Sequence, residues 1–229
     1  MKIFIEKGRS LFFCLLFAGI SFLSAQEIVT AERYLASVAE RYAAVRDYEA
    51  RIIIHSGSTE MYGTVSHRVP SFLRIDFSSP AEQVIAFNGE TLTVYLPGYR
   101  AILNQNVQRR AGGASLATAQ GLSLLRRNYV SAFVTGPNPV ALESGSPERV
   151  VKLRLTRRTN SEGFREILLD INPETRLIRR IEGRTLTDSV VRFDFSNILI
   201  NQGIPENRFI YDAPASANLY NNFLFSDTD

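Results

Sequence analysis

The sequence of 229 residues contains no tryptophan, two histidines and one cysteine, Cys14. Because Cys14 lies in an expected leader segment, no disulfide can cross-link the mature chain, and its stability must come from its core alone. His55 and His67 fall on neighbouring predicted strands and could meet across a hairpin. With no cysteine and no carboxylate at ligand spacing beside them, we interpret both as surface residues and expect no metal and no cofactor.

Sequence motifs of catalytic sites are also missing. No Gly-x-Ser-x-Gly turn is present, although a dispersed Ser-His-Asp set stays open on the sequence alone. Gly112-Gly113 is not followed by the Lys-Ser/Thr of a phosphate-binding loop. Asp170, Asn172 and Glu174 lack the ligand spacing of a calcium loop and fall across a strand end, which favours a hairpin turn. The sequence therefore predicts a protein that is not an enzyme.

The first 25 residues follow the pattern of a cleaved signal peptide, with a basic start, an apolar run too short to span a membrane comfortably, and a small-residue cleavage site. An uncleaved anchor is one alternative. A lipoprotein signal ending at Cys14 is another, but bulky Phe13 and the continuing apolar run argue against it. The basic residues are Lys2, Lys7 and Arg9, the apolar run is Leu11–Leu23, and the cleavage site is Ser24-Ala25.

The charge of the expected mature chain, residues 26–229, is close to neutral. The whole sequence carries +3, and the leader carries +2 from Lys2, Lys7 and Arg9 less Glu6, which leaves +1. A near-neutral exported protein is a poor candidate for nucleic-acid binding. Arginine pairs at 109–110, 126–127, 157–158 and 179–180 suit anionic headgroups, but solvated faces explain them more simply. With no linker, repeat or low-complexity block, we expect one domain.

Alternation of apolar and polar residues predicts antiparallel strands along most of the chain. Two helices interrupt them: one from an N-cap at Thr30 to about Asp47, and one over about Ala114–Arg127, after a mobile Gly112-Gly113 loop that can act as a hinge. The predicted strands lie near Tyr48–Ser56, Glu60–Arg68, Phe72–Phe77, Glu82–Phe87, Thr91–Leu96, Arg100–Asn106, Tyr129–Val134, Val150–Arg157, Phe164–Ile171, Leu177–Arg184, Ser189–Ile200 and Arg208–Tyr211.

The turns and the strand count give the predicted architecture. Asn88-Gly89 indicates a type I′ hairpin turn, and residues 172–175 indicate a turn between two later strands. About eleven strands wrapped around themselves leave a concave face that helices or a ligand must fill. The alternative is a packed sandwich whose apolar faces meet each other. We predict an α+β, mainly β domain.

Several motifs in order resemble the LolA family of periplasmic lipoprotein carriers. The resemblance covers nearly the whole expected mature chain. The family commonly has a tryptophan in these strands, which this sequence lacks. The motifs are Gly63–Pro80, Ile85 with Asn88–Leu92, Tyr95 and Pro97, Leu168–Thr175, Val191–Phe195, and Ile204-Pro205 before Phe209.

The resemblance implies an incomplete antiparallel β-barrel of about eleven strands with a helical lid over its concave apolar face. It implies a periplasmic monomer that shields lipoprotein acyl chains between the inner and outer membranes. A lipoprotein-releasing ABC transporter would load it, and an outer-membrane receptor or the outer membrane itself would receive the cargo. The alternative is a periplasmic sensor of the same fold that recognises lipoproteins or other amphiphiles without transporting them.

We predict that aliphatic and aromatic side chains line the lipid cavity, with ordinary core as the alternative for each. Leu35 and Val38 of the first helix, and Leu122 and Leu125 of the second, would form the lid. Some members of the family have an arginine directly before the proline that corresponds to Pro70, and this arginine helps latch the lid by hydrogen bonds. Val69 holds that place here, so the candidate latch is Arg68, which faces the opposite side. The predicted lining residues are Ile52, Ile54, Val65, Leu73, Ile75, Phe77, Ile85, Leu92, Val94, Phe193 and Phe195.

Overall fold

The structure, a computed structural model, describes residues 29–107 and 117–223. The expected signal peptide and the Gly112-Gly113 hinge lie outside the described residues. The elements are α1 (Ala31–Ala43), β1 (Asp47–Ser56), β2 (Thr59–Arg68), β3 (Phe72–Ser79), β4 (Val84–Phe87), β5 (Thr91–Leu96), η1 (Pro97–Tyr99), β6 (Ala101–Asn106), α2 (Ala119–Asn128), β7 (Tyr129–Phe133), β8 (Val140–Ala141), β9 (Arg149–Arg157), β10 (Phe164–Ile171), β11 (Ile178–Thr185), β12 (Val190–Ile200), η2 (Glu206–Phe209) and β13 (Asn218–Asn221).

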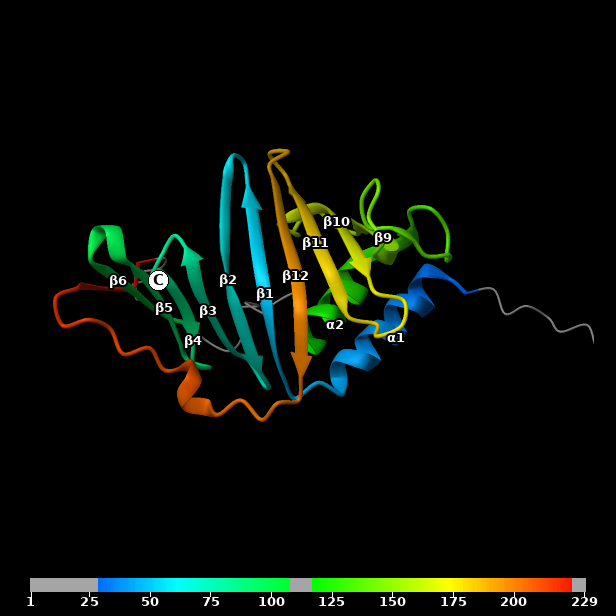
Figure 1. Cartoon of the computed structure of the whole chain (residues 1–229). Helices are drawn as coiled ribbons and strands as arrows, with labels where there is room; N and C mark the ends of the chain where they lie inside the picture. Colours follow the sequence, from blue (N-terminus) through cyan, green and yellow to red (C-terminus); the bar gives the residue numbers. More distant parts are fainter. Residues whose placement is uncertain (1–28, 108–116, 224–229) are drawn as a thin grey trace, which may run out of the picture.

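The described strands form one 13-stranded sheet that stays open, with β13 at one edge and β7 at the other (Figure 1). The strand order is β13-β6-β5-β4-β3-β2-β1-β12-β11-β10-β9-β7, and the two-residue strand β8 pairs with β9. Neighbours are antiparallel except for β13, which runs parallel to β6. The predicted mainly β, incomplete-barrel fold with two helices is confirmed, and the described residues form thirteen strands where the sequence predicts eleven or twelve.

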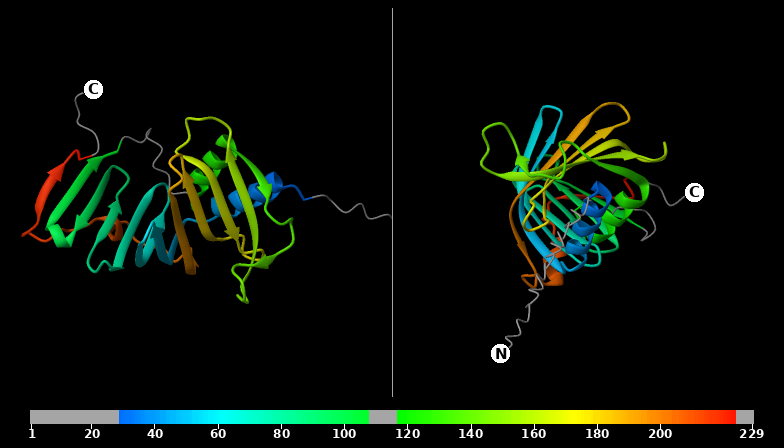
Figure 2. Two further views of the ribbon diagram at one scale, coloured as in Figure 1. Left: turned by 90° about the horizontal axis from the view of Figure 1, so that it is seen from above. Right: turned by 90° about the vertical axis from the view of Figure 1, so that its right-hand side faces the viewer.

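The strand register aligns apolar residues of neighbouring strands in continuous rows across the sheet. In one row Leu153 pairs with Leu169, Leu169 with Ile181, and Ile181 with Phe193. The row continues from Phe193 to Ile54 of β1. Because side chains alternate between faces, rows like this define one apolar face of the sheet. We call it the concave face, because the sheet curves around the helices on this side (Figure 2).

Both helices place their apolar stripes on the concave face, over the half of the sheet that contains β7 and β9–β12 (Figures 1 and 2). Helix α1 begins after Thr30, whose hydroxyl accepts a hydrogen bond from the Arg33 amide at 3.2 Å, as the predicted N-cap requires. Helix α2 begins after Thr118, whose hydroxyl accepts from the Gly121 amide at 3.1 Å. The second helix therefore starts later than the predicted Ala114.

Helix α1 ends at Ala43, four residues before the predicted end at Asp47. Val45 continues the apolar stripe and is buried, which explains the longer prediction. The Asp47 side chain instead accepts hydrogen bonds from the amides of Gln202, at 2.7 Å, and Gly203, at 3.1 Å. These bonds fix the start of β1 to the end of β12, so a tertiary contact decides where the helix ends.

The Asn88-Gly89 hairpin is present, but its predicted turn type is wrong. Gly89 has a φ of 94°, whereas Asn88 is not among the residues of positive φ that a type I′ turn requires. The Asn88 side chain accepts hydrogen bonds from the amides of Glu90, at 3.0 Å, and Thr91, at 2.8 Å. The side-chain oxygen therefore organises a longer loop in place of the two-residue turn. Asn172 does the same for Glu174 and Thr175 in the predicted turn at residues 172–175.

The segment 201–217, which we call the C-terminal strap, crosses the convex face of β3–β6 before β13 begins (Figure 1). The predicted strand at Arg208–Tyr211 is wrong, because residues 206–209 form the short 3₁₀ helix η2. Phe209 is 1% exposed and its ring lies 5.4 Å from that of Phe72. Farther along, Tyr211 packs on a small buried cluster with Tyr95 of β5. The strap therefore gives the outer face of β3–β6 its own small core.

Candidate functional site

The register brings all eleven predicted lining residues onto the concave face. Ala50 pairs with Val65, Val65 with Ile75, and Ile75 with Ile85. Ile85 then pairs with Val94 of β5. The remaining lining residues share this parity through the pairs Ile52–Phe195, Ile54–Phe193, Gly63–Phe77, Leu73–Phe87 and Phe87–Leu92.

Burial divides these residues into two groups. Ile52, Ile54, Val65, Ile75, Phe77 and Phe195 are buried, and Leu73, Ile85, Leu92, Val94 and Phe193 are half-buried. Leu92 and Val94 lie on β5, where no described helix covers the concave face (Figure 1). The apolar surface therefore continues beyond the helices toward the β6 edge.

The four predicted lid residues all face the sheet. Leu35 and Val38 of α1 and Leu122 and Leu125 of α2 are each at most 3% exposed and belong to the main core cluster. In this conformation the helices are packed against β9–β12, and their apolar stripes fill the concave side of that half.

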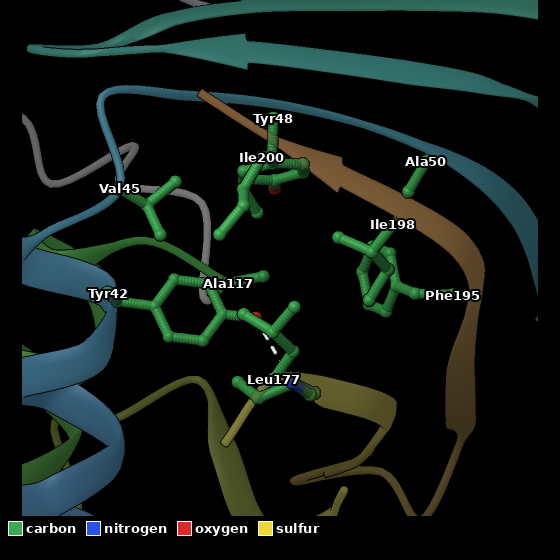
Figure 3. A pocket seen from close by; sticks show the side chains of 10 residues that line it. Tyr42, Val45, Tyr48, Ala50, Ala117, Leu177, Phe195, Ile198 and Ile200 are labelled. Carbon is green, nitrogen blue, oxygen red and sulfur yellow. Dashed lines mark hydrogen bonds between the residues drawn. The ribbon is translucent and has the colours of Figure 1, made fainter. Parts of the chain in front are cut away.

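A small apolar pocket remains where α1 meets the sheet (Figure 3). Its cavity volume is about 10 Å³, which is room for about one water molecule. A cavity of this size is too small for an acyl chain while the helices are packed against the sheet. The residues that line the pocket are Tyr42, Val45, Tyr48, Ala50, Ala117, Leu177, Ile178, Phe195, Ile198 and Ile200.

Two polar side chains in and beside this pocket, those of Tyr42 and His67, are uncharged. The Tyr42 hydroxyl accepts a hydrogen bond from the Ile178 amide at 3.1 Å, and burial raises the pKa of Tyr42 to about 12 (Figure 3). On β2, burial lowers the pKa of His67 below its usual 6.5, and Nδ1 of its ring donates to the Phe72 carbonyl at 2.8 Å. Both side chains are therefore neutral at neutral pH, which suits contact with hydrocarbon.

Arg68 lies on the convex face and contacts the C-terminal strap. Its guanidinium donates to the Ile204 carbonyl at 2.7 Å and forms an ion pair with Glu206 at 3.2 Å. Its hydrogen bonds among the described residues are thus to the strap and not to α1 or α2. A latch role for Arg68 stays a prediction.

The two histidines do not meet. His55 is on the convex face at one end of β1, where its ring nitrogens lie 2.9 Å from Glu60 and 3.4 Å from Asp194. His67 is on the concave face and is 4% exposed, so its predicted surface position is wrong. The described residues contain no group of three or more His, Cys, Asp or Glu residues that could hold a metal ion. Nor do they include a helix of the length and hydropathy that a membrane span needs.

The prediction missed the pocket residues at the ends of β1 and β12. The sequence pattern places Val45 in the first helix, and the predicted lining does not include Tyr48, Ile198 or Ile200. The signal was present in Ile198 and Ile200, which repeat at two residues toward the end of β12. A register shift between Glu49 and Arg51 of β1 is what brings both onto the concave face, and the sequence does not reveal such a shift.

A curved, open sheet that holds two helices against its apolar face defines the fold class of this chain, and a family comparison identifies the family. A family model described as outer membrane lipoprotein carrier protein LolA matches residues 55–212, more than half of the chain. The chain belongs to the LolA family, which confirms the predicted resemblance. A search of curated proteins finds no match.

Solved structures share the fold at low sequence identity. An uncharacterized conserved protein from Thermus thermophilus has a TM-score of 0.53 at 13% identity, over 81% of this chain and 98% of that one. MucB has a TM-score of 0.51 at 16% identity, over 82% of this chain and 64% of that one. The Mycobacterium tuberculosis lipoprotein LppX has a TM-score of 0.50 at 9% identity, over 76% of this chain and 97% of that one.

Proposed function

We propose that this protein is a periplasmic carrier that binds the acyl chains of lipoproteins on its concave face and carries them from the inner to the outer membrane. The observation that supports this most is the continuous apolar concave face, over half of which two helices are packed. Membership of a family described by an outer membrane lipoprotein carrier agrees with it. Export through a cleaved signal peptide, residues 1–25, is part of the proposal.

The magnitudes of the apolar contacts fit a carrier that must release its cargo. Exposing an acyl chain of about 16 carbons to water costs about 12 kcal/mol. Separating Leu35, Val38, Leu122 and Leu125 from the sheet costs about 6–12 kcal/mol, at about 1.5–3 kcal/mol per buried side chain. An entering chain that replaces the helix contacts therefore meets a nearly balanced exchange. Binding is favourable enough to shield the chain and weak enough to let it leave.

A charge on the concave face should test this proposal, with a matched charge on the convex face as control. Phe193→Asp should weaken loading of a fluorescent fatty acid about tenfold or more, because a buried carboxylate opposes hydrocarbon. Leu199→Asp, on the same strand but 55% exposed on the other face, should leave loading unchanged. Phe193 packs against the main core, so its substitution can also disturb folding. Val94→Asp, at a half-buried position of β5, gives a second variant that perturbs folding less. Normal loading by a folded Phe193→Asp or Val94→Asp protein would contradict the lining assignment.

Transport itself needs a cellular measurement. Depletion of the protein should leave outer-membrane lipoproteins in the inner membrane, where an ABC transporter of the releasing type would no longer find an acceptor. Native mass spectrometry of the protein taken from the periplasm should show bound acylated lipoprotein. An unchanged lipoprotein distribution after depletion would refute transport.

The alternative is a binding module of the same fold that recognises lipoproteins or other amphiphiles without moving them. The two proposals differ in one measurement. A carrier transfers bound lipoprotein to acceptor outer membranes, either through a receptor or directly, whereas a sensor retains it.

A further inference from the structure

Four arginines meet at one end of the molecule, beside the last turn of α2. Arg126 and Arg127 are in that last turn, and Arg157 and Arg158 end β9 and begin the following hairpin. Tyr129 pairs with Arg157 across β7 and β9, and the Arg158 amide donates to the Asn128 carbonyl at 2.8 Å. The backbone therefore brings the two arginine pairs together, and we call these four residues the arginine cluster.

The arginine cluster has no anionic partner in the described part of the fold. Among the described residues none of the four forms an ion pair, although Arg127 donates to the Asn128 side chain at 3.2 Å. Elsewhere in the described chain, ion pairs hold arginines such as Arg74, Arg180 and Arg208. Three of the cluster residues are exposed, and Arg157 is half-exposed.

The surroundings leave the cluster strongly positive. Segments 119–133 and 155–165 contain five arginines and a single carboxylate, Glu162. The fifth arginine, Arg165, is paired with Asp188. Four cluster charges less that of Glu162 leave +3. The helix dipole favours cations in the last turn of α2, which accounts for Arg126 and Arg127 but not for Arg157 and Arg158.

We propose that the arginine cluster docks the protein onto an anionic phospholipid bilayer. Val130 is 50% exposed next to the cluster, and Leu186, in the hairpin after β11 at the same end of the sheet, is 52% exposed. Guanidinium groups flanked by exposed aliphatic side chains fit the headgroup boundary, where charges meet phosphate and aliphatic groups enter the acyl region. The preference for a bilayer over an acidic protein rests on the proposed function, since a carrier must reach a membrane.

The position of the cluster gives this docking a consequence for the lid. Leu122 and Leu125 of α2 face the concave sheet, and Arg126 follows directly on the same helix. A bilayer bound at the cluster therefore lies against the end of the helix that must move for lipid to enter or leave.

Vesicle cosedimentation tests the docking surface. The protein should bind vesicles of phosphatidylcholine and phosphatidylglycerol in a two-to-one ratio and should not bind phosphatidylcholine alone. Binding should fall sharply in about 1 M salt, where the Debye length is about 3 Å. The double variants R126Q/R127Q and R157Q/R158Q should each weaken binding about 25-fold, at about fivefold per arginine.

A charge-matched control comes from two exposed arginines of the β1 region. Arg46 and Arg51 form no side-chain ion pair among the described residues, so R46Q/R51Q removes the same charge at another place and should bind as the wild type does. Circular dichroism should confirm that all variants are folded. Equal vesicle binding by the cluster variants and the control would overturn the proposal.

Two further outcomes separate the related hypotheses. The protein could also bind soluble polyglutamate through the cluster and fail to bind vesicles. That result would overturn the bilayer proposal in favour of an acidic protein partner. If vesicle binding requires the cluster but the protein takes up no fatty acid probe, the docking surface is supported and the carrier function is refuted. The cluster variants should load the fatty acid probe normally in the absence of vesicles.

Discussion

The two halves of this sheet are covered on opposite sides. Strands β7 and β9–β12 hold α1 and α2 on their concave face, where Leu153, Leu155, Ile167 and Leu169 are fully buried. Strands β3–β6 carry the C-terminal strap on their convex face, where the buried cluster is much smaller. The difference shows how one continuous sheet can have a firmly packed half and another half that keeps a partly exposed apolar surface on the face a ligand would use.

The largest difference in unfolding free energy should come from truncating one leucine to alanine in each half of the sheet. Leu169→Ala should lower the free energy of unfolding by about 2–5 kcal/mol, because a fully buried leucine leaves a cavity. Leu92→Ala, half-buried on β5, should cost about 1 kcal/mol, since less of its surface leaves water on folding. Denaturant titration measures both. Equal costs would show that the two halves are packed alike.

Loosening the strap should have a local effect. Phe209→Ala should cost about 3 kcal/mol, because this ring is 1% exposed and packs on Phe72. Hydrogen exchange should then speed up in β13 and β6 and stay slow in β9–β11. Ile210→Ala, 63% exposed on the same segment, serves as the control and should change neither. Uniformly faster exchange would mean that the strap stabilises the whole sheet.

The smallest effect should be pH-dependent. Burial raises the pKa of Asp76, but hydrogen bonds from Arg74 and Arg208 outweigh it and hold that pKa below its usual 3.8. Asp76 therefore contributes stability that is present above pH 3.8 and is lost as the pH falls through its lower folded-state value. Asp76→Asn should cost about 1 kcal/mol at neutral pH, after discounting for solvent screening.

Titrating stability against pH checks this sign. The difference in unfolding free energy between wild type and Asp76→Asn should be constant near neutral pH and shrink in acid. Glu166→Gln removes the partner of one arginine, Arg154, whereas Asp76 is bound by two, so this control should change stability less. A difference that grows as the pH falls would contradict the assignment.

Local patterns were sufficient to predict most strands and the inward parity of the sheet. Residues such as Leu73, Ile75 and Phe77 alternate with polar neighbours, and an antiparallel sheet with one solvated face imposes this period directly. The N-cap at Thr30 and the Asn172 turn are likewise decided by neighbouring residues. These features depend on contacts within a few positions of the chain.

The errors lie where distant residues decide the structure. Helix α1 stops early because Asp47 binds the backbone beyond β12. The strap and β13 were missed because they have no periodic pattern of their own and depend on a sheet that is already formed. For the candidate site, the sequence predicted which residues share the apolar face. It could not predict that helix packing leaves a pocket of only about 10 Å³.

The parallel pairing of β13 with β6 has a consequence for how the molecule is made. Residues 218–221 supply backbone partners to a strand at residues 101–106, which leaves the ribosome much earlier. Until those late residues arrive, β6 presents unpaired amides and carbonyls that invite pairing with another chain. Pairing with residues 218–221 then replaces the six-residue edge of β6 with the four-residue edge of β13, and a shorter edge strand offers less backbone to another chain.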